Sequence, residues 1–540
     1  MLVTRTATTF VALVTASLLH AQAQQGLRLF SAFSGTHQLQ LVDTAGQIVH
    51  SWETPEDSLC THMGPDGSVY STGFDPNNVF PGVTGRLLRR DLDGNITWDM
   101  ILNSPQRYMH HDFYVMKNGN VLVMTVDNLT RAHAIADGRD PALLGANTWL
   151  PETIIEVQPI GPNSGTIVWA WHSADHWIQD FDPTRPNYGV VADHPELIDI
   201  NYPPTNLALV GDVHHCNGLD YDEENDWIII SAREQDEVWL IDHSTTTAEA
   251  AGHTGGNRGR GGDLLWRWGN PAAYDRGTVA DRKLFRQHDP RFIPEGFPGE
   301  GNITIFNNVV GPTQSAVIEI ELPVDAGGDP FIDPGSNTFG PDAPVWTYME
   351  PGFFSPFVSG AQRLENGNTL ICEGQFKRLF EVDPAGNIVW QFFDPSPGGF
   401  VFKCDFVDRS MWTRGEEFSR STGGAMSSTA LHDSALAGYT YVMLSSFNVE
   451  GTTPLPGGFE LPFTADLVTT GMLALPNTPL FVNTLGTLDA LGRADSSIVL
   501  PANFLNPILI GQELASAYVI VDSAGAVLKV SNPTTVEIVP

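Results

Sequence analysis

One hydrophobic pattern recurs through the first 400 residues: an apolar strand, a turn, and a second short strand that ends in tryptophan. Apolar and polar residues alternate in these strands, and this alternation is the period of β-structure. The phrase is constant while the spacing between its copies varies, which indicates structural repeats that carry loop insertions. The six copies end at Trp52, Trp98, Trp169, Trp266, Trp346 and Trp390.

A second hairpin lies between successive copies, with Asp-Gly or Asn-Gly at its turn. Examples are THMGPDGSVYST (61–72), HHDFYVMKNGNVLVMT (110–125) and SGAQRLENGNTLICEG (359–374). These dipeptides between alternating strands are strong hairpin signals. Two hairpins make a four-stranded antiparallel blade, so the pattern predicts an all-β fold built as a six-bladed β-propeller. No hairpin precedes the first tryptophan phrase, so we expect that phrase to complete the last blade with strands near 400–407.

The predicted propeller covers residues 24–415. Helical signals are nearly absent from the chain, and the 52 glycines and 38 prolines suit a fold with many turns. Residues 416–462, rich in Ser, Thr, Pro and Gly, are predicted to be an irregular region and linker. Residues 463–540 include a hairpin pattern at 517–532, which predicts a small C-terminal β-domain of unknown role.

The N-terminus has an early Arg, an apolar run from Ala7 to about Leu19, and a small-x-small exit. This pattern predicts a signal peptide over residues 1–23, and the run is too short to span a membrane. We therefore expect an extracytoplasmic protein, periplasmic or secreted, in which two disulfides are possible. The four cysteines, which allow three pairings, are Cys60, Cys216, Cys372 and Cys404.

The charge balance excludes one class of partner. The chain has 28 basic and 63 acidic residues and a net charge of −35, whereas nucleic-acid partners recruit Lys and Arg. The sequence contains no G-x-x-x-x-G-K-[ST], no H-E-x-x-H and no pair of C-x-x-C, so nothing indicates a nucleotide-driven kinase or those zinc sites. No cofactor is expected, and the oligomeric state is left open.

Histidines recur at one predicted place in the propeller. The first strand of a blade lines the central channel, so residues that open the first hairpin of each blade face a common axis. A single histidine there is more often a hydrogen-bonded core residue, but recurrence in four of six blades indicates a site. The residues at this place are His62, His110-His111, His214-His215, Gln287-His288-Asp289 and, in the fifth blade, Ser359-Gly360.

The stretch DVHHCNGLDY (212–221) shows which chemistry these residues suit. His215 and Asn217 share a strand face, whereas His214 faces the other way. The strand register decides whether Arg233 lies opposite His214 or His215. Imidazole, amide and guanidinium groups without a carboxylate pair suit a small oxyanion such as sulfate or phosphate. The histidines could instead bind a metal ion, although the adjacent arginine repels cations.

Several phrases together resemble the bacterial arylsulfotransferase family, the aryl-sulfate sulfotransferases that need no nucleotide donor. They are HHDF, HHCNGLDYDEENDWIIISAR, RQHDPRFIPEG and SGAQRLENGNTLICEGQFKRLFEVDPAGNIVW, and the resemblance runs from about residue 35 to 405. It implies a six-bladed propeller outside the cytoplasm that transfers a sulfuryl group from one phenol to another through a sulfohistidine. An N-terminal β-domain that some members have is not found here, and the C-terminal extension is extra.

The resemblance also implies residue roles. His288, in the Gln-His-Asp phrase, would be the nucleophile, and His111 would lie near the phenolic oxygen. Because the pKa of phenol is near 10, a protonated histidine such as His111 could donate a proton to the leaving oxygen. The small-molecule partners would be an aryl sulfate and a phenol. The residues expected to hold the sulfuryl oxygens or other parts of the substrate are His215, Asn217, Arg233, Ser359 and His62.

Two other functions stay open at the level of the sequence. The first is a non-catalytic secreted propeller that binds a ligand or a surface polymer through its axial mouth. The second is a metal-dependent propeller hydrolase. Binding of an aryl sulfate without release of phenol would identify the first, and loss of activity on chelation would identify the second.

Overall fold

The computed structural model describes residues 22–540, except for 75–79, 146, 204–210 and 331–337. The predicted signal peptide covers residues 1–23, and all of it except its last two residues lies outside the described part. The described chain is nearly all β, with three short α-helices that are α1 (Arg131–Ala136), α2 (Thr247–Ala250) and α3 (Leu467–Ala474). None of the described helices has the length and apolar character needed to cross a membrane.

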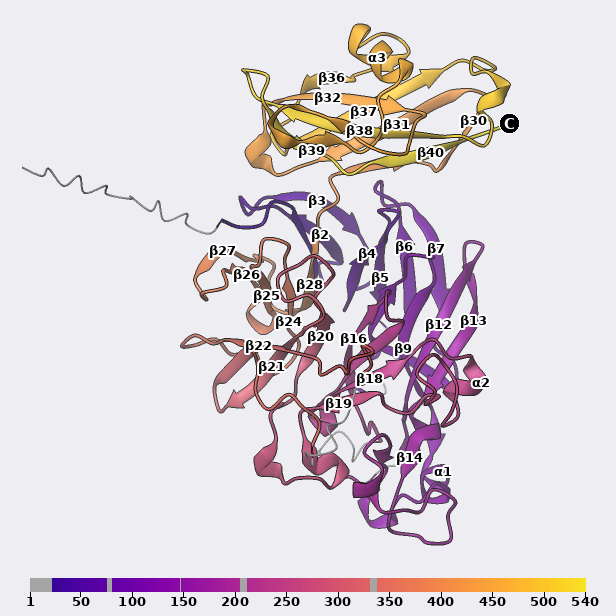
Figure 1. The fold of residues 1–540 in the computed structure, drawn as a ribbon, viewed down its shortest axis with the longest axis vertical. Coiled ribbons are helices and arrows are strands. Elements are labelled where there is room, and N and C mark those ends of the chain that lie inside the picture. Colours follow the sequence, from indigo (N-terminus) through magenta and orange to yellow (C-terminus); the bar gives the residue numbers. More distant parts are fainter. Residues whose placement is uncertain (1–21, 75–79, 146, 204–210, 331–337) are drawn as a thin grey trace, which may run out of the picture.

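Six four-stranded antiparallel sheets follow one another over residues 27–407 (Figure 1). The strands of each sheet are given from the innermost outward. The first sheet contains β28 (Phe400–Val407), β1 (Leu27–Phe33), β2 (Gln38–Val42) and β3 (Ile48–Glu53). The second contains β4 (Thr61–Met63), β5 (Val69–Gly73), β6 (Arg86–Arg90) and β7 (Ile96–Ile101). The third contains β8 (Arg107–Val115), β9 (Val121–Asp127), β12 (Glu152–Ile160) and β13 (Ser164–His172). The fourth contains β16 (Cys216–Asp222), β17 (Trp227–Ala232), β18 (Glu237–Asp242) and β19 (Trp266–Trp268). The fifth contains β20 (His288–Phe292), β21 (Ile303–Gly311), β22 (Gln314–Ile320) and β23 (Trp346–Tyr348). The sixth contains β24 (Gly360–Arg363), β25 (Thr369–Glu373), β26 (Arg378–Val382) and β27 (Ile388–Phe393).

The six innermost strands form a closed cycle. Strand β28 contacts β4, and the contacts continue through β8, β16, β20 and β24 back to β28. The ring closes where the pattern predicted, because β1 pairs with β28 and Arg28 lies opposite Phe406. The chain therefore joins its N-terminal strand to the last sheet, in a propeller-like arrangement that leaves no open edge between the first and the last sheet.

The recurring tryptophans explain the outer edge of this ring. Each stands in the outermost strand of its sheet. Its indole N–H donates to the connection between the third and fourth strands of the next sheet or, for Trp98, to the first residue of the fourth strand. The six bonds are Trp52 to Asp91 O, Trp98 to Ser164 O, Trp169 to Thr245 Oγ1, Trp266 to Gly340 O, Trp346 to Pro384 O and Trp390 to Thr44 O. A largely buried indole needs a partner for its N–H. The tryptophan repeat thus makes a second closed cycle.

Residues 411–540 form a separate pair of sheets. One sheet contains β29 (Met411–Arg414), β31 (Gly424–Leu431), β37 (Arg493–Leu500) and β35 (Phe481–Val482). The other contains β30 (Glu417–Ser419), β40 (Thr534–Val539), β38 (Glu513–Val521), β32 (Thr440–Ser446), β36 (Leu485–Thr487) and β39 (Val527–Val530). Their inward side chains share one apolar core. The remaining short strands are β10 (Leu129–Thr130), β11 (Thr148–Trp149), β14 (Trp177–Ile178), β15 (Ile198–Asp199), β33 (Thr453–Pro454) and β34 (Glu460–Leu461).

The interpretation of residues 416–462 as an irregular linker is wrong. Strands β30, β31 and β32 lie inside it, and Met426 and Met443 enter the core of the C-terminal domain. The sequence signal was weak because β31, GAMSSTAL, is built of small residues with little contrast between apolar and polar positions. The hairpin expected near 517–532 is present as β38 and β39.

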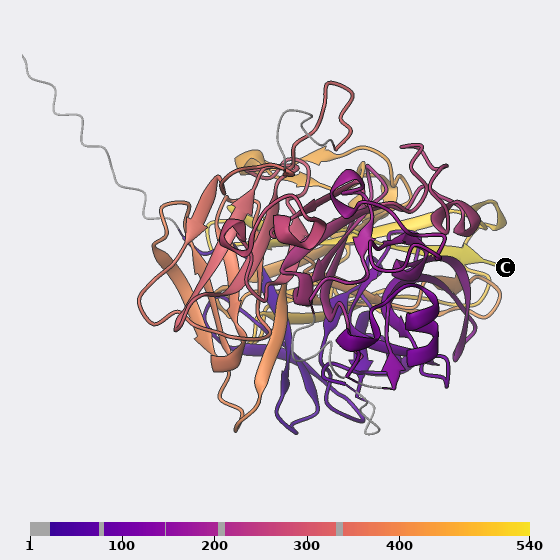
Figure 2. The ribbon, with the colours of Figure 1, turned by 90° about the horizontal axis from the view of Figure 1, so that it is seen from below.

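The C-terminal domain packs on the turns of the first two sheets (Figure 1). Trp412 donates its indole N–H to Gly67 O in the turn after β4 at 2.9 Å, and Arg414 Nε donates to Asp93 in the turn after β6 at 2.7 Å. The turn after β4 lies at the end of an innermost strand, opposite to its first residue, and the turn after β6 lies on the same side because β6 runs parallel to β4. Seen from below, the C-terminal domain lies behind the ring (Figure 2). The starts of the innermost strands therefore face away from this domain.

The C-terminal domain carries a buried histidine with a predictable effect on stability. Neither ring nitrogen of His432 has a partner in the part of the chain that the structure describes. Burial lowers the pKa of His432 to about 3. Between pH 6.5 and 3 the unfolded chain therefore binds a proton that the folded chain does not, so stability is present above this window and is lost as the pH falls.

We expect the pH fall from 7 to 5 to cost wild type about 2 kcal/mol more than the His432→Leu variant. Urea unfolding of both proteins at the two pH values measures this difference. Equal losses in the two proteins would show that His432 does not titrate differently in the folded and the unfolded chain.

Candidate active site

Three innermost strands change their backbone conformation at the predicted site. The φ angles of His111, His215 and Asp289 are 47°, 44° and 52°. Such angles are uncommon for residues other than glycine. The pairing register shifts across His111 in β8 and Asp289 in β20, and in β16 it shifts just after His215, between Cys216 and Leu219. Bulges of this kind re-aim side chains next to functional sites, so the strands are shaped to turn these residues away from a regular ladder.

His288 is held as a neutral imidazole. Its Nδ1 lies 2.8 Å from Asn308 Oδ1 and 3.1 Å from Arg286 O. Both oxygens can only accept, so Nδ1 carries the proton and Nε2 carries the lone pair. The Val358 N–H donates to Nε2 at 3.1 Å. Burial, followed by the positive charge of Arg233, lowers the pKa of His288 to about 3, so the lone pair is available throughout the neutral pH range.

Asn308 fixes this tautomer. Its Nδ2 donates to the backbone oxygens of Ser355 and Val358, each at 2.8 Å. Two carbonyl acceptors on one side leave the amide only one orientation, with Oδ1 turned toward His288. Asn308 lies on β21, next to the strand that begins with His288.

His111 and His215 lie together across two sheets. Their ring centroids are 4.7 Å apart in an edge-to-face arrangement. The Asp212 carboxylate accepts from His215 Nδ1 at 2.5 Å and thereby fixes the orientation of that ring. His111 donates its backbone N–H to Gly82 O at 2.9 Å. A Cβ at position 82 would lie 2.0 Å from the His111 ring, so only glycine permits this approach.

A short chain of side chains leads from Glu152 to His111. His110 Nε2 lies 3.1 Å from Glu152 Oε1, and His110 Nδ1 lies 3.0 Å from His111 Nδ1. Burial opposes the charged form of His110, but the Glu152 carboxylate raises the pKa of His110. Burial, and then His215 and His110, hold the pKa of His111 well below its usual range. These shifts favour the charged form at His110 over the charged form at His111.

The register settles which histidine lies opposite Arg233. Cys216 pairs with Ala232, so the next residues outward, His215 and Arg233, are opposite each other. Arg233 begins a 3-10 turn (Arg233–Gln235) and forms an ion pair with Glu234. Its charge acts on His288 in the neighbouring sheet. The structure therefore brings Arg233 and the three axial histidines into one neighbourhood.

Asn217 and Ser359 border this neighbourhood. Asn217 is fully buried, and its Nδ2 donates to Gln287 O, next to His288, at 3.0 Å. Ser359 has a φ of 88°, donates its backbone N–H to Phe402 O and accepts at Oγ from Gly374 N. The Phe402 ring lies 5.8 Å from His111 and 6.3 Å from His288. In this structure Asn217 thus joins β16 to the His288 strand.

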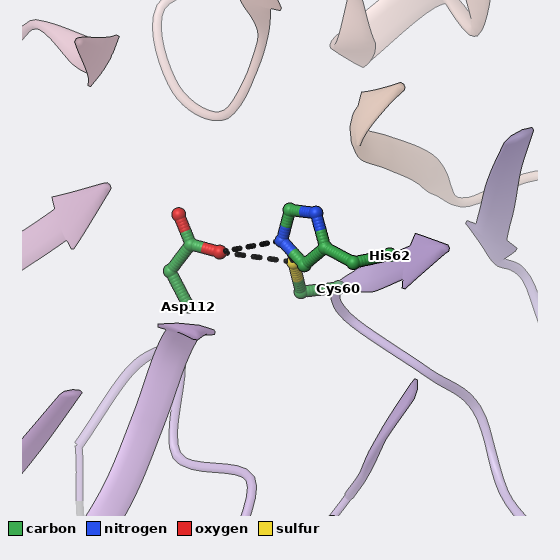
Figure 3. Close-up of side chains that lie close together, drawn as sticks. All are labelled: Cys60, His62 and Asp112. Atoms are coloured by element: carbon green, nitrogen blue, oxygen red, sulfur yellow. Dashed lines mark hydrogen bonds and ion pairs between the residues drawn. The ribbon is translucent and has the colours of Figure 1, made fainter. Parts of the chain in front are cut away.

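His62 lies in a different cluster from the other predicted site residues. Its Nε2 is 3.2 Å from Asp112 Oδ1, and its Nδ1 is 2.5 Å from Asp405 Oδ2. Figure 3 shows Asp112 facing both His62 and Cys60. Burial disfavours the charged ring, but Asp405 and its neighbours raise the pKa of His62 well above its usual range. His62 also lines a cavity of about 250 Å³ with Lys403.

Behind the axial histidines is a buried network of charges. Lys403 Nζ lies 2.7 Å from Asp112 and 3.3 Å from Asp289. Arg291 bridges Asp289 and Asp405 at 2.9 and 2.7 Å. Cations and carboxylates alternate, so each buried charge has an opposite partner. Cys60 and the other three cysteines are buried and free, so the disulfides that the sequence allowed are not formed.

Several contacts of the candidate site were not predicted from the sequence, although signals for some were present. Asp212 stands three residues before His215, where a carboxylate can reach the histidine ring. Asn308 lies on the strand that pairs with the one beginning at His288, within the apolar run ITIFNNVV (303–310). Glu152 and Lys403 had no local signal, because they reach the site from sheet positions far away in the chain.

One family model and several solved structures are similar to this chain. The family model described as Arylsulfotransferase (ASST) matches residues 16–389. No curated protein matches the chain. A protein of unknown function from Bacteroides caccae is 13% identical, with 71% of this chain and 99% of that chain covered and a TM-score of 0.40.

Two further solved structures are similar at comparable levels. The periplasmic gluconolactonase PpgL of Pseudomonas aeruginosa is 11% identical, with 71% of this chain and 99% of that chain covered and a TM-score of 0.33. The β-propeller domain of Myceliophteria thermophila Cps50 (Swd1) is 10% identical, with 69% and 91% covered and a TM-score of 0.34.

Proposed function

The chain belongs to the arylsulfotransferase family, and we propose that it transfers a sulfuryl group from an aryl sulfate to a phenol without a nucleotide donor. The observation that carries this proposal is His288, a buried neutral imidazole under the influence of the Arg233 charge. A neutral imidazole offers a lone pair to sulfur, and a guanidinium matches the negative oxygens around it.

We assign the six sheets over residues 27–407 as the blades of a six-bladed β-propeller that works outside the cytoplasm. The cycle of innermost strands and the cycle of tryptophan bonds support the first assignment, because each returns to its starting sheet after six steps. The apolar run before residue 20 supports the second.

In the first step His288 Nε2 attacks the sulfur atom. A nitrogen–sulfur bond forms, the bond from sulfur to the aryl oxygen breaks, and a phenolate leaves. The ring then carries a positive charge, and its Nδ1–H remains directed at Asn308 Oδ1 and Arg286 O. In the second step the oxygen of an acceptor phenol attacks the same sulfur, the nitrogen–sulfur bond breaks, and neutral His288 is restored.

Donors around His288 stabilise the sulfuryl oxygens. Sulfuryl transfer resembles phosphoryl transfer, in which positioning and charge stabilisation supply most of the catalysis. Arg233 provides a planar fork of donors, and His215 is held in place by Asp212. The Val358 N–H, which donates to Nε2 before the reaction, is freed toward these oxygens when Nε2 binds sulfur. Asn217 is assigned a positioning role, since it ties β16 to the carbonyl before His288.

The proton for the leaving phenolate comes along the Glu152–His110–His111 chain. Protonated His110 donates from Nδ1 to His111 Nδ1, so the proton of neutral His111 is on Nε2. When His111 gives that proton to the phenolate, it takes the Nδ1 proton of His110. The acceptor phenol returns a proton by the reverse path. General acid catalysis of this kind contributes roughly 10² to 10⁴ in rate.

The test uses EDTA-treated mature protein with 4-nitrophenyl sulfate, with and without phenol. Release of nitrophenolate that phenol accelerates is the expected result, because the acceptor removes the sulfuryl group from His288. Release that appears only after metal is restored would favour a metal-dependent hydrolase instead. Binding of the aryl sulfate without any release, in both metal-free and metal-restored protein, would favour a ligand-binding propeller.

Replacing Arg233 with lysine is expected to lower kcat by about 10²-fold, because a point charge cannot reproduce two parallel donors. Steady-state kinetics with 4-nitrophenyl sulfate measures the effect. Arg258, a partly exposed arginine on the connection between β18 and β19, is the matched control, and its lysine variant should keep wild-type kcat. An unchanged kcat in Arg233→Lys would remove Arg233 from this role.

A further inference from the structure

A second histidine cluster lies outside the axial site. His176 ends the 3-10 turn Ser173–His176 that follows β13, while His253 and Asp263 lie on the connection between β18 and β19. His176 Nδ1 is 2.8 Å from Asp263 Oδ1, and His253 Nδ1 is 2.7 Å from the same oxygen. Two imidazole nitrogens and one carboxylate oxygen from two neighbouring sheets therefore converge on one point.

The hydrogen bonds of neutral His176 leave its Nδ1, the nitrogen that faces Asp263, without a proton. His176 Nε2 lies 2.9 Å from Ala250 O, an oxygen that only accepts, so Nε2 carries the proton. In the neutral ring Nδ1 is then a bare lone pair, and it faces a carboxylate oxygen, which is another acceptor. Such a contact is satisfied by an additional proton or by a cation. A histidine that donates its outer N–H to a carbonyl is the usual arrangement of a metal ligand.

The surrounding packing fixes His176 in this orientation. The Trp171 ring stacks on it with the centroids 5.7 Å apart and the planes 5° apart. The Trp171 N–H donates to Gly262 O at 2.7 Å. A Cβ at position 262 would lie 2.0 Å from Ala250 O and 2.6 Å from His176 Nε2, so this approach requires glycine. Two of the converging groups, His176 and Asp263, are buried, whereas the His253 side chain is 60% exposed.

The charges near this cluster differ from those around Cys60, His62 and Asp112. There, the Lys403 ammonium already neutralises Asp112, and burial raises the pKa of the Cys60 thiol to about 11. In contrast, no lysine or arginine forms an ion pair with Asp263 within the described ranges. A cation is therefore disfavoured at the first cluster, while the carboxylate of the second has only histidines as ion-pair partners among the described residues.

We propose that His176, His253 and Asp263 bind a zinc ion, with water in the remaining position on the exposed side of His253. Zinc takes imidazole and carboxylate ligands at about 2.0 to 2.2 Å in a tetrahedral arrangement, which places the ligand atoms roughly 3.3 Å apart. The present separations of 2.8 and 2.7 Å require the Asp263 carboxylate to move away from His176, and His253 to move away from Asp263, each by about half an ångström. The exposure of the His253 side chain permits its shift. The ion would fasten the β18–β19 connection to the sheet that ends in β13.

The experiment is titration of the EDTA-treated full chain with Zn²⁺ by calorimetry. We expect one ion per chain and a higher Tm with zinc than without, because an ion that binds only the folded chain stabilises it. His253→Ala should weaken binding by more than about 100-fold, since even the loss of an outer partner costs 10- to 100-fold. His194→Ala is the matched control, because His194 is a half-exposed histidine with a single carboxylate partner, and it should bind as wild type does.

Cobalt distinguishes the two clusters. Co²⁺ bound by His176, His253 and Asp263 should give visible d–d bands without a thiolate-to-metal charge-transfer band, whereas a site that contains Cys60 should give both. The proposal is overturned if Zn²⁺ produces neither heat nor a change in Tm, if His253→Ala binds as tightly as wild type, or if the cobalt complex shows the thiolate band.

Discussion

Replacing His288 with glutamine is expected to lower kcat for sulfuryl transfer by at least about 10⁴-fold and to abolish any burst of phenol release. Glutamine is close to histidine in size and keeps a polar group next to Asn308, but its amide has no lone pair that can attack sulfur. In His288 the proton is held on Nδ1 by Asn308 Oδ1, which leaves the Nε2 lone pair free to attack. Stopped-flow measurement of nitrophenolate release gives both the burst and the steady rate.

The matched control for this variant is His432→Gln. His432 is also a buried histidine whose pKa is lowered to about 3, but it lies in the C-terminal domain, which packs on the turns away from the axial histidines. It should keep wild-type kcat. Mass spectrometry of wild type quenched with donor alone should show the added mass of one SO₃ group on the peptide that contains His288. A full burst in His288→Gln would reject His288 as the nucleophile.

The fold was largely predictable because its repeat is carried by local patterns. Alternating strands, Asp-Gly and Asn-Gly turns and the tryptophan phrase each depend on neighbouring residues, and together they gave the strand order and the closure through β1 and β28. The bonds from each tryptophan to the next sheet explain why that residue recurs. The C-terminal sheets were only partly predicted, because strands such as β31 lack apolar contrast.

The site was predicted in part, and the case of His62 shows why. His62 lies five residues before the turn glycine Gly67, whereas His111 lies eight residues before Gly119. Three residues on a strand correspond to about 10 Å, so His62 stands further along the channel than His111. Counting from the turn would have revealed this difference. The proton position on His288 could not be predicted, because it depends on Asn308 and on the carbonyls that orient its amide.

Removing the ammonium group of Lys403 is expected to lower the free energy of unfolding by about 3 kcal/mol. Lys403→Met keeps the apolar stem but leaves the buried carboxylates of Asp112 and Asp289 without their shared cation. Burial opposes charge on Lys403, yet these two carboxylates raise its pKa well above the usual range, so the group is charged. Asp112 keeps His62 as a partner, and Asp289 keeps Arg291. The expected loss of unfolding free energy is therefore at the lower end of the range for a broken buried ion pair.

Urea unfolding measures the loss, with the exposed Lys117→Met as the control that should stay within about 0.5 kcal/mol of wild type. A double-mutant cycle with Asp112→Asn tests the cause. A coupling energy of about 1 to 3 kcal/mol is expected for charges in direct contact, while simple additivity would contradict the pairing. Asp112 directly follows His111, and Asp289 directly follows His288. If the network holds these strands in place, Lys403→Met should therefore also lower kcat, although Lys403 bonds to neither histidine.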